Sequence, residues 1–178
     1  MNRLTESQKQ EIWSVTVETV EKANNLFQNL RMQTPTVEFT KMGTTAGRAF
    51  PSRNIVKFND TLAAENFEAF KKRTVVHEVA HLIDYQLHGW QHTRNGRRIM
   101  HGASFKRIMV HLGADPSTCH SYDVSSVRKS RKQYVWTNSV GTVMLLGAQR
   151  HKRALAGTRY WMRGDTVKDY QYKGVAPF

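Results

Sequence analysis

The stretch HEVAH, residues 77–81, decides how the rest of this sequence is interpreted. It lies in a run from about residue 65 to 87 that contains no Gly or Pro to interrupt a helix. Within that run apolar residues recur at steps of three and four, which is the spacing of one buried helical face. The pattern therefore predicts that HEVAH lies on a helix with an apolar stripe formed by Val76, Ala80, Ile83 and Leu87.

The spacing of the two histidines suits a metal ion. Residues four apart on an α-helix differ by about 40° in direction, so the imidazoles of His77 and His81 can converge on one ion. Glu78 points about 100° away, close enough to reach a water molecule on that ion without being a ligand. A zinc hydrolase uses this arrangement: the cation lowers the pKa of the water and the carboxylate removes its proton. The alternative is a chance match on an ordinary helix, because the motif fixes few positions.

A catalytic zinc site usually has three protein ligands, so a further histidine downstream should complete it. His101 is the best placed, because it immediately precedes the amphipathic segment GASFKRIM and a helix folding back there would bring it to the metal. His88 lies about 10 Å further along the helix than His81, which is too far to share the ion. The remaining candidates are interpreted as solvated or structural side chains: His92, His111 and His120.

Two further positions on the HEVAH helix restrict the type of site. A metzincin would have Gly at position 84 and His at position 87, and Asp84 and Leu87 stand there instead, which excludes that subclass. Asp84 or Tyr85 could orient a ligand or stabilise an oxyanion, although Asp84 could equally be an ordinary solvated or paired residue.

The other elements predict an α+β fold, and 178 residues suffice for one main domain with a small appendage. A capping box at residues 5–8 begins a predicted helix over residues 6–31. Short strands are expected at TVEFTKM (36–42) and NIVKFN (54–59), and a second amphipathic helix is expected at 105–112. Beyond Pro116, four segments have the composition of short strands: KQYVW, GTVMLL, TRYWM and DYQYKG.

The charge is strongly basic and unevenly distributed. The net charge is +13, and residues 1–70 hold eight of the 27 Lys and Arg and eight of the 14 Asp and Glu. The whole excess therefore lies in residues 71–178, which favours a polyanionic partner, of which nucleic acid is the commonest. The alternative is a basic solvated surface without a specific partner.

The cysteine count and the hydropathy indicate the compartment. Cys119 is the only cysteine, which excludes an internal disulfide and a cysteine-based zinc knuckle. No signal peptide or run of about 18 apolar residues is present, so no membrane association is expected. The sequence predicts an intracellular protein, cytoplasmic or nucleoid-associated and not secreted.

At this point the motifs match a known family. VVHEVAHLIDYQLHG (75–89), followed by HGASFKRIM (101–109), resembles the SprT-like zinc metalloproteases, whose core joins HExxH to a downstream HGxxF that carries the third ligand. The family includes Spartan, a protease that degrades proteins crosslinked to DNA. The resemblance covers about residues 11–112 and continues weakly in CHSYDV and QRHKRALAG.

The resemblance implies a zincin-like domain with a single catalytic zinc ion. Its ligands would be His77, His81 and His101, and Glu78 would be the general base that activates the zinc-bound water. The substrate would be a protein associated with or crosslinked to DNA, lying extended along a strand edge that NIVKFN could supply.

The C-terminal part departs from the family pattern. Many members carry a zinc ribbon with two cysteine pairs, and this chain has none there. We therefore expect a catalytic domain over residues 1–115 and a basic, β-rich subdomain over residues 116–178, held together by strand pairing and aromatic side chains. Its Tyr and Trp residues could stack on unpaired bases, or they could form the core of the subdomain itself. Its candidate nucleic-acid contacts are Arg150, Lys152, Arg153, Arg159 and Arg163.

Two other functions remain open at the level of sequence. One is a DNA-binding module on an inactive zincin scaffold, in which zinc has a structural role, although Glu78 would then have no purpose. The other is a zinc hydrolase that cleaves bonds other than those of peptides, such as an amidase.

Overall fold

The structure, a computed structural model, describes residues 3–117, 122–128 and 131–176. The chain divides into two compact units, residues 1–128 and 129–178. Each unit has its own hydrophobic core. Helices and small sheets occur together, so the predicted α+β class is confirmed.

The first unit begins with a long helix, α1 (Glu6–Leu26). The predicted capping box is present, because Thr5 Oγ1 accepts a hydrogen bond from Gln8 N and the Gln8 side chain accepts one from Thr5 N. The helix ends earlier than the predicted residue 31. Asn24 explains the early end, since its side chain bonds both the N–H and the carbonyl of Met32 and so holds the chain in a turn.

A three-stranded sheet follows, made of β1 (Thr36–Thr40), β2 (Gly47–Phe50) and β3 (Ile55–Asn59). The order is β1-β3-β2, with β1 parallel and β2 antiparallel to β3. The predicted NIVKFN strand is therefore the middle of the sheet, and the prediction that it offers a free edge is wrong. The short 3₁₀ turn η1 (Pro51–Arg53) joins β2 to β3.

The region before the HEVAH motif is not one continuous helix. It consists of α2 (Asp60–Glu65), α3 (Phe67–Ala69) and a π-helical segment, η2 (Phe70–Val75), before α4 (Val76–His88) begins. A π-helical turn rotates the chain differently from an α-helical one, so it changes which side chains face the core. Here Phe70, Thr74 and Val75 are buried.

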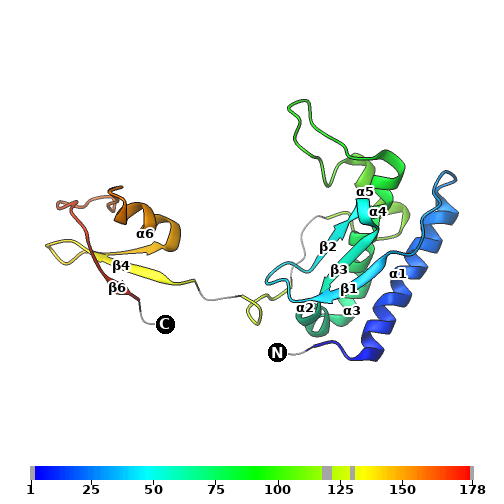
Figure 1. Cartoon of the computed structure of the whole chain (residues 1–178), viewed down its shortest axis with the longest axis horizontal. Coiled ribbons are helices and arrows are strands. Elements are labelled where there is room, and N and C mark those ends of the chain that lie inside the picture. Colours follow the sequence, from blue (N-terminus) through cyan, green and yellow to red (C-terminus); the bar gives the residue numbers. More distant parts are fainter. Residues whose placement is uncertain (1–2, 118–121, 129–130, 177–178) are drawn as a thin grey trace. The chain divides into compact units, whose positions relative to one another are not determined.

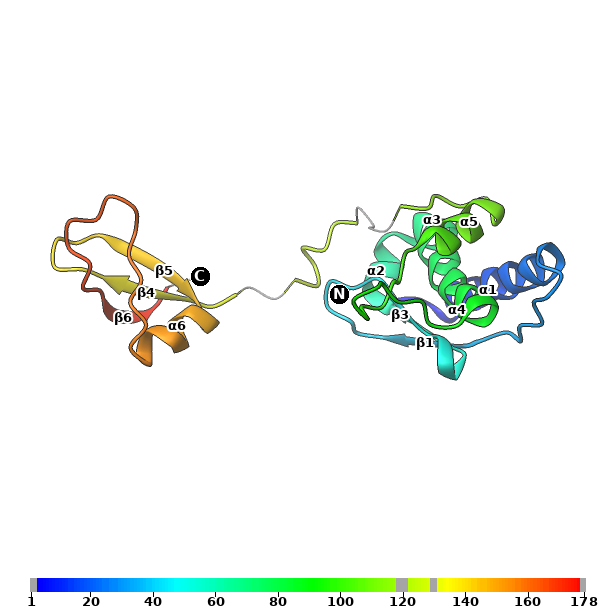
Figure 2. The ribbon, with the colours of Figure 1, turned by 90° about the horizontal axis from the view of Figure 1, so that it is seen from above.

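The second predicted amphipathic helix is α5 (Ala103–His111), which packs against α4. Phe105, Ile108 and Met109 enter the core, and the backbone turns away at Gly113, whose φ of +76° favours glycine. The helices cover one face of the sheet, as Figures 1 and 2 show from two directions.

Part of the segment after α5 belongs to the first unit. Tyr122, Val124 and Val127 pack against the core of that unit, and Tyr122 stacks on Phe70 at 6.0 Å. The division between the two units therefore falls at residue 128 and not at the predicted residue 115.

The second unit is a small antiparallel sheet with one helix. Its elements are β4 (Gln133–Thr137), β5 (Val143–Gly147), α6 (Ala148–Leu155) and β6 (Gln171–Val175), with strand order β5-β4-β6. The fully or nearly buried core consists of Trp136, Met144 and Leu146. None of the helices among the described residues is long and apolar enough to cross a membrane.

One predicted strand of this unit is wrong and one helix was missed. TRYWM, residues 158–162, forms no strand, because the Asp165 carboxylate binds Met162 N and the Tyr170 hydroxyl and shapes a loop instead. The segment that follows β5 is the helix α6, which sequence analysis did not predict.

Candidate metal centre

Three histidines meet at one point of the first unit. His77 and His81 lie one turn apart on α4, and His101 lies just before α5. One ligand nitrogen from each lies within 4.8 Å of the others, so the three could hold a metal ion. The Nε2 atoms of His77 and His101 are 3.1 Å apart.

Phe105 positions all three rings. It is fully buried one turn after His101, and its ring centroid lies 4.4 Å from that of His81 and 5.0 Å from those of His77 and His101. The packing of α5 on α4 thus sets the distance between the third histidine and the other two. This contact explains why a ligand far along the sequence can complete the pair on α4.

The environment keeps the imidazoles neutral. Burial lowers the pKa of His77 to about 4 and that of His81 to about 3, and it also lowers the pKa of His101. Charge repulsion from His101 further lowers the pKa of His77, and repulsion from His77 and His101 further lowers the pKa of His81. Neutral imidazole is the form that binds a metal, so the donor set fits a divalent cation that accepts nitrogen ligands.

Glu78 lies between α4 and the sheet. It is 7% exposed, and burial raises the pKa of its carboxyl to about 8, against the opposing effects of a hydrogen bond from Ala49 N–H and the nearby charge of Arg48. Ala49 and Arg48 belong to β2. The edge of the sheet therefore holds the Glu78 side chain beside the histidines. Glu78 is not one of the three residues that could hold a metal ion.

Gly47 makes room for this carboxylate. A Cβ atom on Gly47 would lie 2.7 Å from Glu78 Cγ and 2.9 Å from its Oε1, closer than real contacts of this kind. Gly47 lies 31 residues before Glu78 in the chain. Its spatial role could not be recognised, because the contact joins residues far apart in sequence.

The histidines and Glu78 line an open cleft with a volume of about 510 Å³. One wall is formed by residues 44–46 and the β2 residues Gly47, Arg48 and Ala49, and the rim includes Arg73 and Met100. The cleft is thus bounded by the edge strand of the sheet on one side and by the metal-binding helix on the other.

The other residues of α4 singled out from sequence have different partners. Asp84 Oδ1 lies 3.0 Å from His88 Nδ1, and the carboxylate also accepts a hydrogen bond from Gln91 Nε2. Gln91 in turn donates to Ser104 Oγ at 2.7 Å, so Asp84 links the end of α4 to the start of α5. The ring of Tyr85 packs on Trp90.

The other histidines considered as ligands do not line the cleft where the structure describes them. His92 is exposed, and His111 Nδ1 lies 2.7 Å from the carbonyl of Arg107 in its own helix. Cys119 and His120 lie outside the described residues.

The predicted nucleic-acid contacts are exposed residues of the second unit. Arg150, Lys152 and Arg153 lie on α6, whereas Arg159 and Arg163 lie in the following loop. The Arg159 side chain is 3.7 Å from Asp169, and both are exposed. Of the aromatic residues, Trp136, Tyr134 and Tyr160 belong to the small core, whereas Trp161 is 54% exposed.

Comparison with known proteins agrees with the motifs. The profile of the SprT-like family matches residues 16–123. A protein named Protein SprT from Shewanella oneidensis is 36% identical over 128 residues, which cover 71% of this chain and 76% of that protein. Protein SprT from Pseudomonas fluorescens is 39% identical over 132 residues, covering 72% and 75%. No solved structure matches. The family match and these relatives confirm the resemblance of the two histidine motifs: the chain belongs to the SprT-like family.

Proposed function

We propose that this protein is a zinc-dependent endopeptidase that acts on proteins associated with or crosslinked to DNA. The observation that carries the proposal is the meeting of three neutral histidines and one buried carboxylate in a single open cleft. In this proposal the first unit is a zincin-like catalytic domain, and the second is a basic, β-rich subdomain.

Zinc is the metal that suits this donor set. His77, His81 and His101 would hold one ion through three nitrogens, which is the ligand number of catalytic zinc sites with an open fourth position. Bound there, zinc would supply Lewis-acid polarisation of the scissile carbonyl and make water a stronger acid. Neutral imidazoles need not lose protons before they bind it.

Glu78 is the proposed general base. Its carboxylate lies in the same cleft as the histidines and is held in place by Ala49 N–H. Burial raises the pKa of this carboxyl to about 8, and the positive charge of a bound zinc ion would lower that pKa and favour the ionised form. In peptide hydrolysis one oxygen of the carboxylate would take a proton from the attacking water, and the same oxygen would then pass that proton to the nitrogen of the leaving amine. The tight fit against Gly47 restricts the positions that the Glu78 side chain can take in the cleft.

The strand edge that binds the substrate is proposed to be β2. This strand pairs with β3 on one side, and its residues Gly47, Arg48 and Ala49 line the cleft on the other. An extended peptide can add to such an edge through main-chain hydrogen bonds, which give affinity with little dependence on sequence. Recognition through the main chain suits an enzyme that must cut many different proteins.

The charge distribution supports the association with DNA. Residues 129–178 contain 10 of the 27 Lys and Arg and two of the 14 Asp and Glu. Arg150, Lys152 and Arg153 are exposed together on α6, and phosphate contacts by such residues provide sequence-independent binding. DNA would then concentrate the enzyme near its substrates.

The test is cleavage of a DNA-binding protein by zinc-loaded wild type and by Glu78→Gln, with and without single-stranded DNA. Loss of the general base should lower the rate by about 10²- to 10⁴-fold while zinc content stays the same. The matched control is Glu18→Gln, which makes the same change at an exposed carboxyl on α1.

Three outcomes separate the alternatives. We expect wild type and Glu18→Gln to cleave the protein, Glu78→Gln to fail, and DNA to increase the rate of cleavage. If neither wild type nor Glu78→Gln cleaved proteins or small amides, the chain would be an inactive scaffold with structural zinc. Hydrolysis of small amides without any cleavage of proteins would indicate a different class of zinc hydrolase.

A further inference from the structure

A basic arm projects from the first unit between the second and third histidines of the metal centre. The arm comprises residues 89–101 and folds back on itself as a narrow hairpin (Figure 1). His92 and Arg98 form an antiparallel bridge, Ile99 N donates to Gln91 O at 2.8 Å, and Thr93 N donates to Arg97 O at 2.7 Å. Gly96 turns the chain at the tip, where its φ is +74°.

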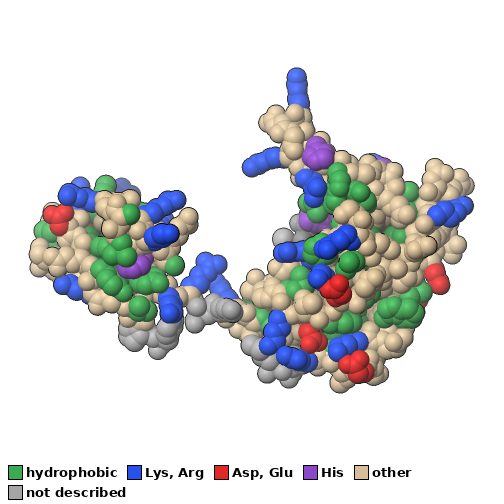
Figure 3. All heavy atoms as spheres, viewed as in Figure 1, with side chains coloured by type: hydrophobic (Ala, Val, Ile, Leu, Met, Phe, Trp, Pro, Cys, Tyr) green, Lys and Arg blue, Asp and Glu red, His purple; other side chains and the backbone are tan. Residues whose placement is uncertain are grey.

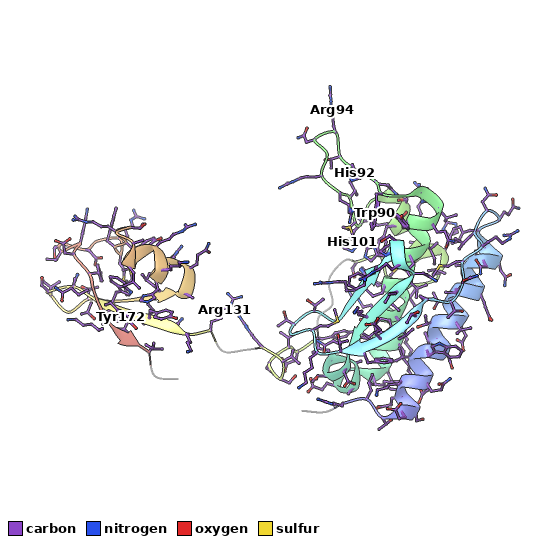
Figure 4. The ribbon with its side chains drawn as sticks, viewed as in Figure 1. Trp90, His92, Arg94, His101, Arg131 and Tyr172 are labelled. Atoms are coloured by element: carbon purple, nitrogen blue, oxygen red, sulfur yellow. The ribbon has the colours of Figure 1, made fainter. Side chains whose placement is uncertain are left out.

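The base of the arm is anchored on both neighbouring helices. The ring of Trp90 packs on Tyr85 of α4 at 4.6 Å, and the guanidinium of Arg98 lies 3.6 Å from the Trp90 centroid. Gln91 bonds Ser104 of α5. Figure 4 shows Trp90 and His101 near the base, with His92 and Arg94 further out. The arm is thus a folded element whose base is fixed on α4 and α5.

The arm carries positive charge without compensation. Residues 89–101 contain three arginines and no Asp or Glu. Arg94 and Arg97 are exposed, and neither forms an ion pair with any residue that the structure describes. Figure 3 shows Lys or Arg side chains in blue on the projecting segment, and Figure 4 labels Arg94 at its outer end.

We propose that this arm binds the phosphate backbone of nucleic acid. Arginine forks match phosphate oxygens in two parallel hydrogen bonds, and such contacts position a protein on nucleic acid without reading its sequence. A two-stranded ribbon is narrow enough to enter the major groove of a duplex. The alternative partner, an acidic segment of a protein, would not require arginines on a projecting ribbon, and it is distinguished by the test below.

The arm lies close to the proposed metal centre, so nucleic acid bound to the arm would lie near the cleft. The tip of the arm at Gly96 is five residues from His101, so it lies at most about 18 Å from the metal centre. Nucleic acid on the arm would pass beside the cleft, and a protein attached to that nucleic acid would be brought to Glu78. This consequence rests on the proposed endopeptidase function, whereas the binding itself does not.

The test measures binding by the full chain carrying Glu78→Gln, so that proteolysis does not interfere. Arg94→Gln and Arg97→Gln are combined, and Arg98 is kept because it packs on Trp90. The matched control combines Lys41→Gln and Arg107→Gln, two exposed cations outside the arm, and it has the same net charge. Affinity for a short duplex and for one of its strands is measured at several salt concentrations.

The arm variant should bind nucleic acid more weakly than the control. If each arginine contacts one phosphate, the slope of log affinity against log salt should decrease by about 1.8 on duplex and about 1.4 on a single strand. The form of nucleic acid that shows the larger loss is the one that the arm binds. Equal affinities and slopes for the two variants would overturn the proposal.

Two further measurements keep this result separate from the proposed function. Binding to poly-glutamate is measured in parallel, and a loss confined to that polymer would overturn the proposal in favour of acidic proteins. Without the Glu78 change, the arm variant should cleave a free peptide at the wild-type rate but lose part of the stimulation by DNA. A chain with no peptidase activity would refute the proposed function and leave the binding comparison intact.

Discussion

At the scale of single residues, the absence of a side chain at Gly47 helps to determine where Glu78 lies. Gly47 allows β2 to approach Glu78 so closely that any Cβ would overlap with the carboxylate side chain. The backbone of Ala49, two residues later, then reaches that carboxylate with its N–H. The position of the Glu78 side chain is therefore determined as much by the edge strand as by the helix that carries it.

Gly47→Ala should lower peptidase activity by about 100-fold, because a displacement of about 1 Å in a reacting group has an effect of that size. The three heavy atoms nearest to the new methyl group all belong to Glu78, so zinc content should remain at the wild-type level. Gly147→Ala is the matched control, since a Cβ there meets nothing within 4 Å. Full activity of Gly47→Ala would mean that the contact with Glu78 has no role in catalysis.

The third ligand can be tested against a neighbour in the same arm. His101→Ala should weaken zinc binding by more than about 100-fold, because even the loss of a group that only orients a ligand costs 10- to 100-fold. His92→Ala removes an exposed imidazole nine residues earlier and should leave zinc affinity unchanged. Competition with a chromophoric chelator measures both. Equal loss in the two variants would contradict the ligand set of His77, His81 and His101.

At the scale of elements, the two helices that bring the histidines together could be predicted from sequence, and the strand opposite them could not. The apolar spacing around HEVAH and around Phe105 is a local pattern, and it predicted α4 and α5 and the approach of His101. The position of β2 depends on strand order, which places NIVKFN in the middle of the sheet and GRAF at its edge. Strand order is a property of distant pairing, so local alternation carries no information about it.

The second unit also contains an element, α6, that local hydropathy does not predict. The sequence of α6, AQRHKRAL, has few apolar residues, and one of its contacts with the sheet is made by a histidine. His151 stacks on Tyr134 with a centroid distance of 3.8 Å, and its Nδ1 accepts a hydrogen bond from Trp136 Nε1 at 3.1 Å. Hydropathy does not identify such a contact, because histidine is not counted as a core residue.

His151→Phe should therefore destabilise the second unit by about 1–3 kcal/mol. The substituted ring can still stack on Tyr134, but the buried Trp136 N–H loses its acceptor, and an unsatisfied buried donor has a cost of this size. Lys152→Gln changes the exposed neighbour and should have little effect. Hydrogen exchange of the β4 amides measures both variants. Unchanged protection in His151→Phe would show that the hydrogen bond does not hold α6 to the sheet.

At the scale of the whole molecule, the metal centre and the most basic region belong to different units. All three histidines lie in residues 1–128, around one large core, whereas the core of residues 129–178 has three buried apolar residues. A core this small provides limited stability. Strand pairing and the contacts of His151 hold this small unit together.

The two units should consequently respond differently to zinc. A ligand that binds the folded state at 100 times its dissociation constant stabilises that state by about 2.7 kcal/mol. Amides of α4 and α5 should exchange up to about 100-fold more slowly with zinc, whereas those of β4 should exchange at the same rate with and without it. Hydrogen exchange on the full chain measures both regions in one experiment.

The His101→Ala chain is the control for this comparison, because it should lose most of the zinc-dependent protection of α4 without altering the second unit. Protection of β4 by zinc would contradict the expectation in one of two ways. If it disappeared in His101→Ala, the stability of the two units would be coupled. If it persisted there, the second unit would bind zinc itself, through residues other than the three histidines.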